Sequence, residues 1–246
     1  MGDHLDVDPP EFARQRAYDI RFDWGAEGVA ACAGDVVVVV DVLRFTTAVE
    51  AAAGHGLAVH PYRWKDSTAQ SFAQSVGAVL ADGREPSGPS LSYASLLALP
   101  SHGSVVLPSP NGATCALSAA ETGATVTAAC LRNARAVARW AASAGGSVTV
   151  IACGERWPDG SLRPAVEDLL GAGAVIASLT GHCSREAETA MGAFRGMATS
   201  LPVALRGCAS GRELIEKGWL QDVDYAAAVD VSDVVPVMSR GVFVAT

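Results

Sequence analysis

A run of five consecutive valines, Val36 to Val40, constrains the fold more than any other stretch of the sequence. β-Branched residues favour extended backbone, and a run without alternating polar residues is typical of a strand buried on both faces. Such strands occur in parallel sheets that are covered by helices on each side. The run therefore predicts an α/β protein with a strand over residues 36–40 at its centre.

Polar residues follow these valines directly. Asp41 comes first, and Arg44, Thr46 and Thr47 follow before an alanine-rich stretch that predicts a helix ending near Gly54. Ligands of open α/β sheets bind beyond the carboxyl ends of strands. A carboxylate can hold Mg2+ or attack phosphorus, and a guanidinium can clamp phosphate oxygens. The segment therefore predicts a site for a phosphate and a metal; the alternative is that Asp41 only caps the helix and Arg44 only pairs with an acid.

Strand-like and helix-like segments alternate along the rest of the chain. The further strand candidates are 18–24, 56–62, 78–81, 104–107, 124–129, 147–153 and 241–245. This alternation predicts a three-layer α/β/α fold with a largely parallel or mixed sheet. A chain of 246 residues is long enough for either a single α/β domain or two intertwined α/β lobes.

Charge, hydropathy and cysteine spacing narrow the class of protein. The formal net charge of -8 argues against a general nucleic-acid binder, which needs a basic face. No segment has the apolar length that spans a bilayer, and residues 1–15 lack the features of a signal peptide. The six cysteines are scattered without a CxxC pair, which predicts free thiols. We therefore expect a cytoplasmic protein that binds neither nucleic acid nor membrane, and base rates favour a homodimer.

Other turns that follow predicted strands carry residues suited to an anion. These candidates are Arg84, Asn111, Gly112 and Asn133. Arg84 stands in a loop rich in glycine, proline and serine, where binding residues often occur. Gly112 would let the backbone approach a ligand closely, and the helix that follows would add positive potential. Asn133 is predicted as a helix cap or as a contact to the ligand.

A pair of acids, Glu167 and Asp168, opens a helix of small residues after the buried strand 147–153. Acids at a helix start are favoured by the helix dipole, which alone would account for the pair. Together with Asp41 they can also supply oxygen ligands for Mg2+, which takes few protein carboxylates and keeps several waters. Gly154, which follows the strand, completes the predicted substrate-binding residues.

Four segments of the chain resemble the 2-phosphosulfolactate phosphatase family. They are VVVVVDVLRFTTAVEAA at 36–52, SPNGATCAL at 109–117, CGERWPDGSLRPAVEDLLGAGAVI at 153–176 and SGRELIEKGWLQDVDYAAAVDVSDVVPV at 210–237. The first is the most specific, because it joins a hydrophobic strand to Asp-Val-Leu-Arg and a Thr pair. The resemblance covers most of the chain from about Asp35 onward.

The resemblance implies a Mg2+-dependent phosphomonoester hydrolase with a mixed-sheet α/β/α fold. Its substrate would be a small anionic phosphorylated compound, in the family a three-carbon sulfonate-carboxylate on the route to coenzyme M. The implied metal ligands are Asp41, Glu167 and Asp168. Catalytic roles fall to Asp41, Arg44 and Asp168. The implied anion pocket is lined by Arg44, Thr46, Thr47, Asn111, Gly112 and Asn133.

The sequence departs from the family pattern in loops that would contact the substrate. The loop 82–95 keeps Arg84 but lacks a later Asp and Asn that the family carries. Ser109-Pro110 replaces a Thr pair, and Ala113 replaces a Thr. These departures leave the natural substrate open.

Three alternatives compete with this function. A haloacid-dehalogenase-type phosphatase also begins with a buried strand ending in Asp, but it needs a second Asp two residues later, where this chain has Leu43. A non-catalytic binder of phosphorylated or sulfonated metabolites would result if the substrate loops had diverged. A plain structural scaffold is disfavoured, because several strand ends carry polar residues.

Overall fold

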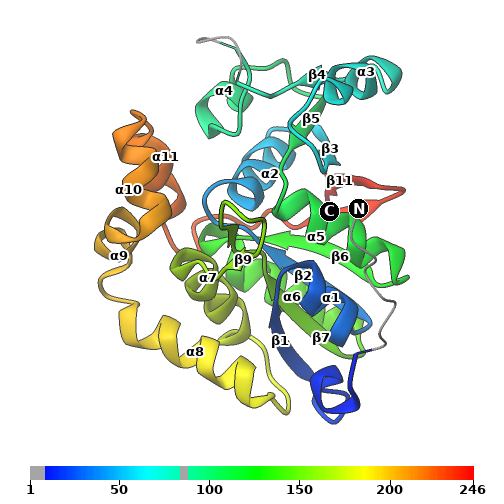
Figure 1. Cartoon of the computed structure of the whole chain (residues 1–246), viewed down its shortest axis with the longest axis vertical. Helices are drawn as coiled ribbons and strands as arrows, with labels where there is room; N and C mark the ends of the chain where they lie inside the picture. The colour runs from blue at the N-terminus through cyan, green and yellow to red at the C-terminus, as the bar shows by residue number, and fades with distance from the viewer. Residues whose placement is uncertain (1–8, 84–87) are drawn as a thin grey trace.

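A nine-stranded mixed sheet lies at the centre of the computed structural model, which describes residues 9–83 and 88–246 (Figure 1). The strand order is β1-β7-β2-β6-β10-β11-β3-β5-β4. The strands are β1 (Ile20–Trp24), β2 (Val36–Val40), β3 (Ala58–Tyr62), β4 (Val79–Leu80), β5 (Ser104–Pro108), β6 (Thr125–Ala129), β7 (Val148–Ala152), β10 (Pro236–Ser239) and β11 (Val242–Ala245).

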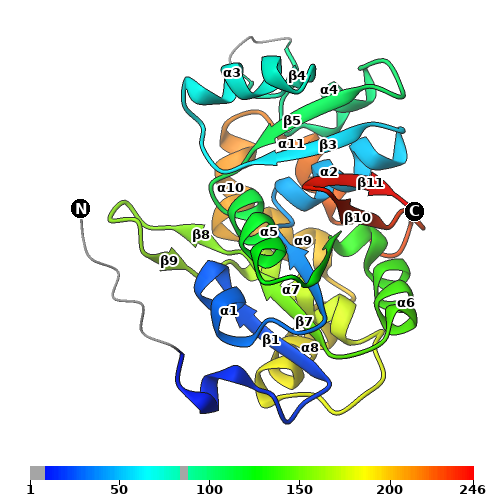
Figure 2. The ribbon, with the colours of Figure 1, turned by 90° about the vertical axis from the view of Figure 1, so that its right-hand side faces the viewer.

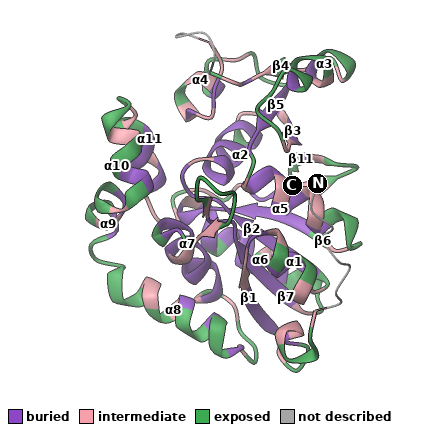
Figure 3. Ribbon diagram, viewed as in Figure 1, coloured by how far each residue is buried: buried purple, intermediate pink, exposed green. Residues whose placement is uncertain are grey.

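Helices flank the sheet, so the predicted α/β class with a mixed central sheet is confirmed. They are α1 (Gly25–Cys32), α2 (Phe45–Gly54), α3 (Thr68–Ser75), α4 (Tyr93–Leu97), α5 (Gly112–Glu121), α6 (Ala134–Ala144), α7 (Val166–Ile176), α8 (Arg185–Met197), α9 (Leu201–Gly207), α10 (Ala209–Glu216) and α11 (Leu220–Ala226). Two 3-10 turns, η1 (Glu11–Arg14) and η2 (Leu131–Asn133), complete the set. Figure 3 shows the strands of the sheet as largely buried and the outer helices as partly exposed.

The valine run forms β2, which lies inside the sheet between β7 and β6 and is parallel to both. Val36, Val38 and Val40 belong to one hydrophobic cluster with residues of α6, α7 and α8. Val37 and Val39 belong to a second cluster with residues of α1, α2 and α5. Because successive side chains of a strand point to opposite faces, an uninterrupted apolar run is stable only where both faces are covered.

A C-terminal hairpin occupies the middle of the sheet. Strand β10 pairs antiparallel with β6, and β11 pairs antiparallel with β10 and with β3. The hairpin, red in Figure 2, therefore joins a block of parallel strands (β1, β7, β2, β6) to a second parallel block (β3, β5, β4). Three successive antiparallel pairings make the two blocks run in opposite directions.

Helix α7 packs unusually close to the sheet because it carries small residues. A Cβ atom on Gly171 would lie 2.6 Å from Cγ2 of Val42 and 2.8 Å from Cγ1 of Val40. Close packing at this point fixes the start of α7 beside the carboxyl end of β2. From α7 the chain continues through α8 to α11, which run along the outside of the molecule (Figure 1, yellow to orange).

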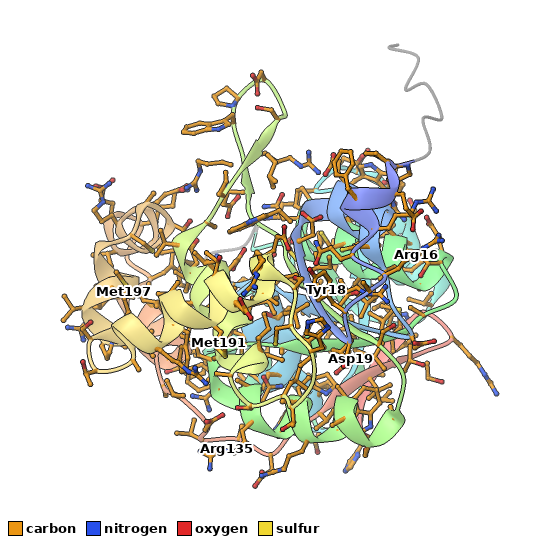
Figure 4. All side chains as sticks on the ribbon, turned by 90° about the horizontal axis from the view of Figure 1, so that it is seen from below. Arg16, Tyr18, Asp19, Arg135, Met191 and Met197 are labelled. Atoms are coloured by element: carbon orange, nitrogen blue, oxygen red, sulfur yellow. The ribbon has the colours of Figure 1, made fainter. Side chains whose placement is uncertain are left out.

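A small hairpin leaves the carboxyl end of β7. Its strands β8 (Glu155–Arg156) and β9 (Leu162–Arg163) pair antiparallel and form a separate two-stranded sheet. Figure 4 shows this hairpin, in yellow-green, projecting from the body of the protein. Its base therefore lies close to the strand ends, whereas its tip extends away from them.

Two further expectations concern membranes and thiols. Among residues 9–83 and 88–246, no helix is long and apolar enough to cross a bilayer. All six cysteines are free, four of them buried, which confirms the prediction of free thiols.

Candidate active site

Asp41 lies at the end of β2, where the strand ordering brings several other chain segments together. Its Oδ1 accepts a hydrogen bond from the Phe45 amide at 3.1 Å. Its Oδ2 accepts one from the Gly112 amide at 2.9 Å and a longer one from the Ser109 hydroxyl at 3.4 Å. The side chain therefore caps the start of α2, as the structural alternative predicts, and also ties α2 to the start of α5.

Gly112 is the first residue of α5, and its lack of a side chain permits the contact with Asp41. A Cβ atom there would lie 2.7 Å from Asp41 Oδ2 and still closer to the ring of Phe45. No side chain fits between α5 and the Asp41 turn. The close approach predicted for Gly112 thus occurs, although its partner is a carboxylate of this chain.

A cavity of about 210 Å3 opens beside Asp41. Its lining residues are Asp41, Leu43, Arg44, Phe45, Lys65, Leu91, Ser109, Pro110, Asn111, Glu155 and Arg156. They come from the turns after β2, β3 and β5, from the segment before α4 and from β8. Three cationic side chains and two carboxyl groups therefore share one small cavity, which suits a compact anion and a proton transfer.

Glu155 is the second carboxyl group of the cavity. The Asn111 side chain donates a hydrogen bond from Nδ2 to Glu155 Oε2 at 2.8 Å. Burial, and then the nearby charge of Asp41, raise the pKa of Glu155 to about 7. Burial likewise raises the pKa of Asp41 to about 6, against the lowering effect of the Phe45 and Gly112 amides. Both carboxyl groups therefore change protonation near neutral pH, which is common at catalytic sites.

Arg44 lines the cavity and also pairs with an acid, as the structural alternative predicts, whereas its contact with a phosphate stays a prediction. Its Nη1 donates to Asp222 Oδ2 at 2.7 Å. Its guanidinium carbon lies 4.9 Å from the centre of the Trp219 ring, within the range of a cation–π interaction. Asp222 and Trp219 belong to the segment at the start of α11, which thus reaches the candidate site.

Thr46 and Thr47 do not line the cavity. The Thr46 hydroxyl donates to the Asp41 carbonyl oxygen at 2.8 Å, and the Thr47 hydroxyl donates to the Val42 carbonyl oxygen at 2.8 Å. Both residues are buried inside α2, whose N-cap position is Arg44, and neither caps the helix. In contrast to the predicted contact with substrate, the two hydroxyls brace the backbone of the Asp41 turn.

Asp168 holds two backbone segments together. Its Oδ1 accepts from the Val42 amide at 2.7 Å and its Oδ2 accepts from the Gly154 amide at 2.9 Å. Burial and the neighbouring charge of Asp41 raise its pKa well above the ordinary value. Neither Gly154 nor Asp168 lines the cavity. The Gly154 amide and the Asp168 carboxylate bond to each other. The two residues instead join the turn after β2 to the turn after β7.

Replacing Asp168 with alanine tests this bracing role. The change leaves two buried amides without an acceptor, and each unsatisfied buried group costs roughly 1–3 kcal/mol. We expect the D168A protein to lose roughly 2–5 kcal/mol of unfolding free energy, measured by urea denaturation. The matched control is D159N in the exposed turn of the β8–β9 hairpin, which should shift stability far less. Unchanged stability of D168A would contradict the role.

Three other predicted residues lie elsewhere or outside the described chain. Asn133 is fully buried, and its side chain bonds the Cys130 amide at 2.8 Å and the Val234 carbonyl oxygen at 2.9 Å. It therefore braces the backbone near η2 and does not face the cavity. Glu167 is buried beside Cys208 and does not line the cavity. Arg84 falls outside the described residues.

The match to a known family agrees with this geometry. A family model described as 2-phosphosulpholactate phosphatase matches residues 27–241. The chain belongs to the 2-phosphosulpholactate phosphatase family. The matched range includes every residue that lines the cavity, and the resemblance drawn from four sequence segments is confirmed. The 2-phosphosulpholactate phosphatases are phosphoric monoester hydrolases. A comparison with curated proteins gives no significant match.

The three acids expected to hold a metal in a 2-phosphosulpholactate phosphatase lie close enough for their charges to interact, but only Asp41 lines the cavity. Asp41 faces the cavity, whereas Asp168 is directed at backbone amides and Glu167 is buried outside the lining. Within the part of the chain that the structure describes, no group of three or more His, Cys, Asp or Glu side chains is arranged to hold a metal ion. The roles of Glu167 and Asp168 as metal ligands remain predictions of the sequence alone.

Sequence reasoning missed several residues of this 2-phosphosulpholactate phosphatase cavity. Glu155 and Arg156 come three and four residues after the buried strand β7, close to a strand end as Asp41 is, and that place was the signal available for them. Lys65 comes after β3 in the same way. From the sequence Ser109 is only a departure from the family pattern, although its hydroxyl contacts Asp41 in the structure.

Proposed function

We propose that this chain is a Mg2+-dependent phosphatase of small phosphate monoesters, acting on 2-phosphosulfolactate or a similar three-carbon polyanion. The observation that carries the proposal is the cavity of about 210 Å3 that Arg44, Lys65 and Arg156 line together with the carboxyl groups of Asp41 and Glu155. Cationic side chains bind phosphate oxygens and stabilise the charge that develops during transfer. The small volume favours a compact substrate.

The donor set fits Mg2+ bound through one protein carboxylate. An ionised carboxylate offers about four acceptor positions, and hydrogen bonds from Phe45, Gly112 and Ser109 occupy three of those on Asp41. Mg2+ commonly binds through one or two carboxylates, several waters and the substrate phosphate. Asp41 would hold the ion, which when bound would polarise a phosphate oxygen.

The remaining residues of the cavity have distinct roles in the proposed reaction. Arg44, Lys65 and Arg156 bind the phosphate oxygens. Asn111 orients Glu155 through their 2.8 Å hydrogen bond. Glu155, with a pKa of about 7, accepts a proton from the attacking water, since a general base works best with a pKa near the working pH. In both routes the P–O bond to the alcohol breaks, and the leaving oxygen takes a proton from solvent. In the other route Asp41 attacks phosphorus directly, and Glu155 then accepts a proton from the water that releases the phosphate from Asp41.

Phosphate release from a panel of monoesters tests the proposed function. The panel contains 2-phosphosulfolactate, 2-phospholactate without the sulfonate, and a bulky aromatic phosphate, each assayed with Mg2+ and with EDTA. We expect release from the first compound with Mg2+, weaker release from the second, and none above background with EDTA. Absence of release from every compound, with phosphate still raising the thermal midpoint, would favour the non-catalytic binder. The haloacid-dehalogenase alternative is not favoured, because the second acid it needs is replaced by Leu43 in the cavity wall.

The pH dependence of the reaction follows from Glu155. A base must be deprotonated, so kcat/KM of the Mg2+-saturated enzyme should rise with pH and level off, with a midpoint at or below about 7 because a bound cation lowers the pKa. The E155Q variant should lose this rise and roughly 100-fold to 10000-fold of activity. The control is E121Q, whose exposed side chain pairs with Arg63 at the end of α5. An E155Q enzyme with an unaltered pH profile would refute the base.

Expectations for location and assembly stay proposals. The free thiols agree with a reducing, cytoplasmic compartment. A homodimer, and a small anionic substrate as the main binding partner, follow from base rates and from the family. Size-exclusion chromatography with light scattering measures whether the protein is a homodimer.

A further inference from the structure

The guanidinium of Arg44 is held from behind by a nearly buried carboxylate. Asp222 is 5% exposed, and each of its oxygens has one partner. Oδ2 accepts from Arg44 Nη1 at 2.7 Å, and Oδ1 accepts from the Ser92 hydroxyl at 2.7 Å. A buried carboxylate with a hydrogen bond on each oxygen is held in one orientation, so it can hold the guanidinium in turn.

The pairing leaves most of the Arg44 donors unoccupied by Asp222. A guanidinium carries five N–H groups in a planar fork, and the hydrogen bond to Asp222 involves only Nη1. Trp219 lies against the guanidinium at 4.9 Å. With one edge bonded and one face covered, rotation of the guanidinium is restricted, and its remaining donors are available to an anion in the cavity that Arg44 lines.

The helix that carries Asp222 is anchored independently of Arg44. Tyr225, one turn further along α11, stacks on Tyr93 with ring centres 3.8 Å apart. The guanidinium carbon of Arg132 lies over the Tyr225 ring, 3.5 Å from its centre. Arg132 also pairs with the buried Glu50 at 3.0 Å. These contacts join α11 to α4, to η2 and to α2, so the position of Asp222 does not depend on its bond to Arg44.

We propose that Asp222 is a positioning residue that orients Arg44 for binding of the substrate phosphate, so that α11 belongs to the active site. The inference rests on the proposed function for the identity of the reaction, but it concerns anion binding in the cavity and has its own measurement. Asp222 touches neither the phosphate nor the reacting atoms and acts through the guanidinium alone.

Binding of inorganic phosphate to the full chain, measured by isothermal titration calorimetry, tests the assignment. The D222N variant keeps the shape and the acceptor for Ser92 but loses the charge, so we expect Kd to rise by about tenfold or more. The matched control is D224N on the same helix, where Asp224 pairs with the exposed Arg206 at 2.7 Å and does not line the cavity. D224N should bind phosphate like the original protein.

A double-mutant cycle separates positioning from a general structural effect. R44Q alone should weaken phosphate binding, and D222N added to R44Q should change Kd by less than about twofold, because Asp222 acts only through Arg44. In turnover assays D222N should raise KM more than it lowers kcat. If D222N fails to fold, S92A provides the second variant, with a smaller rise in Kd in the same direction.

Each outcome decides the assignment. An unchanged Kd for D222N, or a D222N effect that persists in the R44Q background, overturns the positioning role. Failure of the original protein to bind phosphate also overturns it. If the original protein binds phosphate but releases none from any monoester, the proposed function fails, and a D222N effect that vanishes with R44Q still supports the positioning role.

Discussion

Replacing Asp41 with asparagine is expected to abolish phosphate release while leaving the protein at least as stable at pH 8. The substitution removes the charge that would hold the metal or attack phosphorus, and we expect a loss of roughly 1000-fold or more in kcat. The effect on stability has the opposite sign. Burial raises the pKa of Asp41 from 3.8 to about 6, so the ionised carboxylate is disfavoured in the folded protein.

The sign of the pH dependence follows from this shift. A carboxyl group with a raised pKa in the folded state adds stability that is fully present below pH 3.8 and is lost as the pH rises through about 6. This rise in the pKa of Asp41, from 3.8 to about 6, corresponds to roughly 3 kcal/mol. Asparagine avoids this cost but loses an acceptor for the Gly112 amide, a loss of roughly 1–3 kcal/mol. As the pH is lowered from 8 to 4, the free energy of unfolding of the original protein should therefore rise relative to that of D41N.

Thermal and urea unfolding of D41N at pH 8 and pH 4, together with phosphate release at pH 8, measure both effects. The control is D35N at the opposite end of β2, where Asp35 accepts hydrogen bonds from Ser147 and lies far along the strand from the cavity. D35N should keep its activity. Full activity of D41N would exclude Asp41 from the reaction, and a large loss of stability at pH 8 would make it mainly a structural cap.

Replacing Gly112 with alanine is expected to damage both the fold and the site. The new Cβ would lie 2.7 Å from Asp41 Oδ2 and closer still to the Phe45 ring, in the buried contact between α5 and α2. Overpacking of this kind costs roughly 1–3 kcal/mol. Because the Gly112 amide holds Asp41 in place, a shift of α5 also moves the carboxylate, and we expect roughly a 100-fold loss of kcat/KM.

Two glycines of α8 provide matched controls for this substitution. A Cβ on Gly192 or Gly196 meets no atom within 4 Å. Alanine is the better helix former by roughly 0.8–1.0 kcal/mol, so G192A and G196A should be neutral or stabilising and fully active. Urea denaturation and kcat/KM of the three variants make the comparison. If the stability and the kcat/KM of G112A match those of the two controls, the Asp41 turn can move away from α5 without loss of either.

Part of the site was accessible from the sequence because it depends on neighbours along the chain. An apolar β-branched run ending in an acid predicts the position of Asp41 beyond a buried strand, and β2 and Asp41 are found there. The Asn111-Gly112 turn predicts a close backbone approach at a helix start, which also occurs. Both features arise from local backbone geometry, which propensity and spacing encode directly.

Other assignments required the direction of side chains in three dimensions. Thr46, Thr47, Asn133 and Asp168 are polar residues near strand ends, as is Glu155, and the sequence does not separate them. In the structure, the first four bond to backbone groups and Glu155 faces the cavity. Buried polar groups must find hydrogen-bond partners, and the supply of unpaired backbone amides and carbonyls depends on how distant segments pack.

The sequence by itself determined the α/β class, the buried central strand, the acid at its end and membership of a phosphatase family. Only the tertiary structure decided that the C-terminal hairpin enters the middle of the sheet, that Glu155 and Arg156 share a cavity with Asp41, and that Asp222 pairs with Arg44. The physical reason is the range of the interactions. Strand and helix preferences act over a few neighbouring residues. The Asn111–Glu155 and Arg44–Asp222 contacts join residues 44 and 178 positions apart and form only when the whole chain has packed.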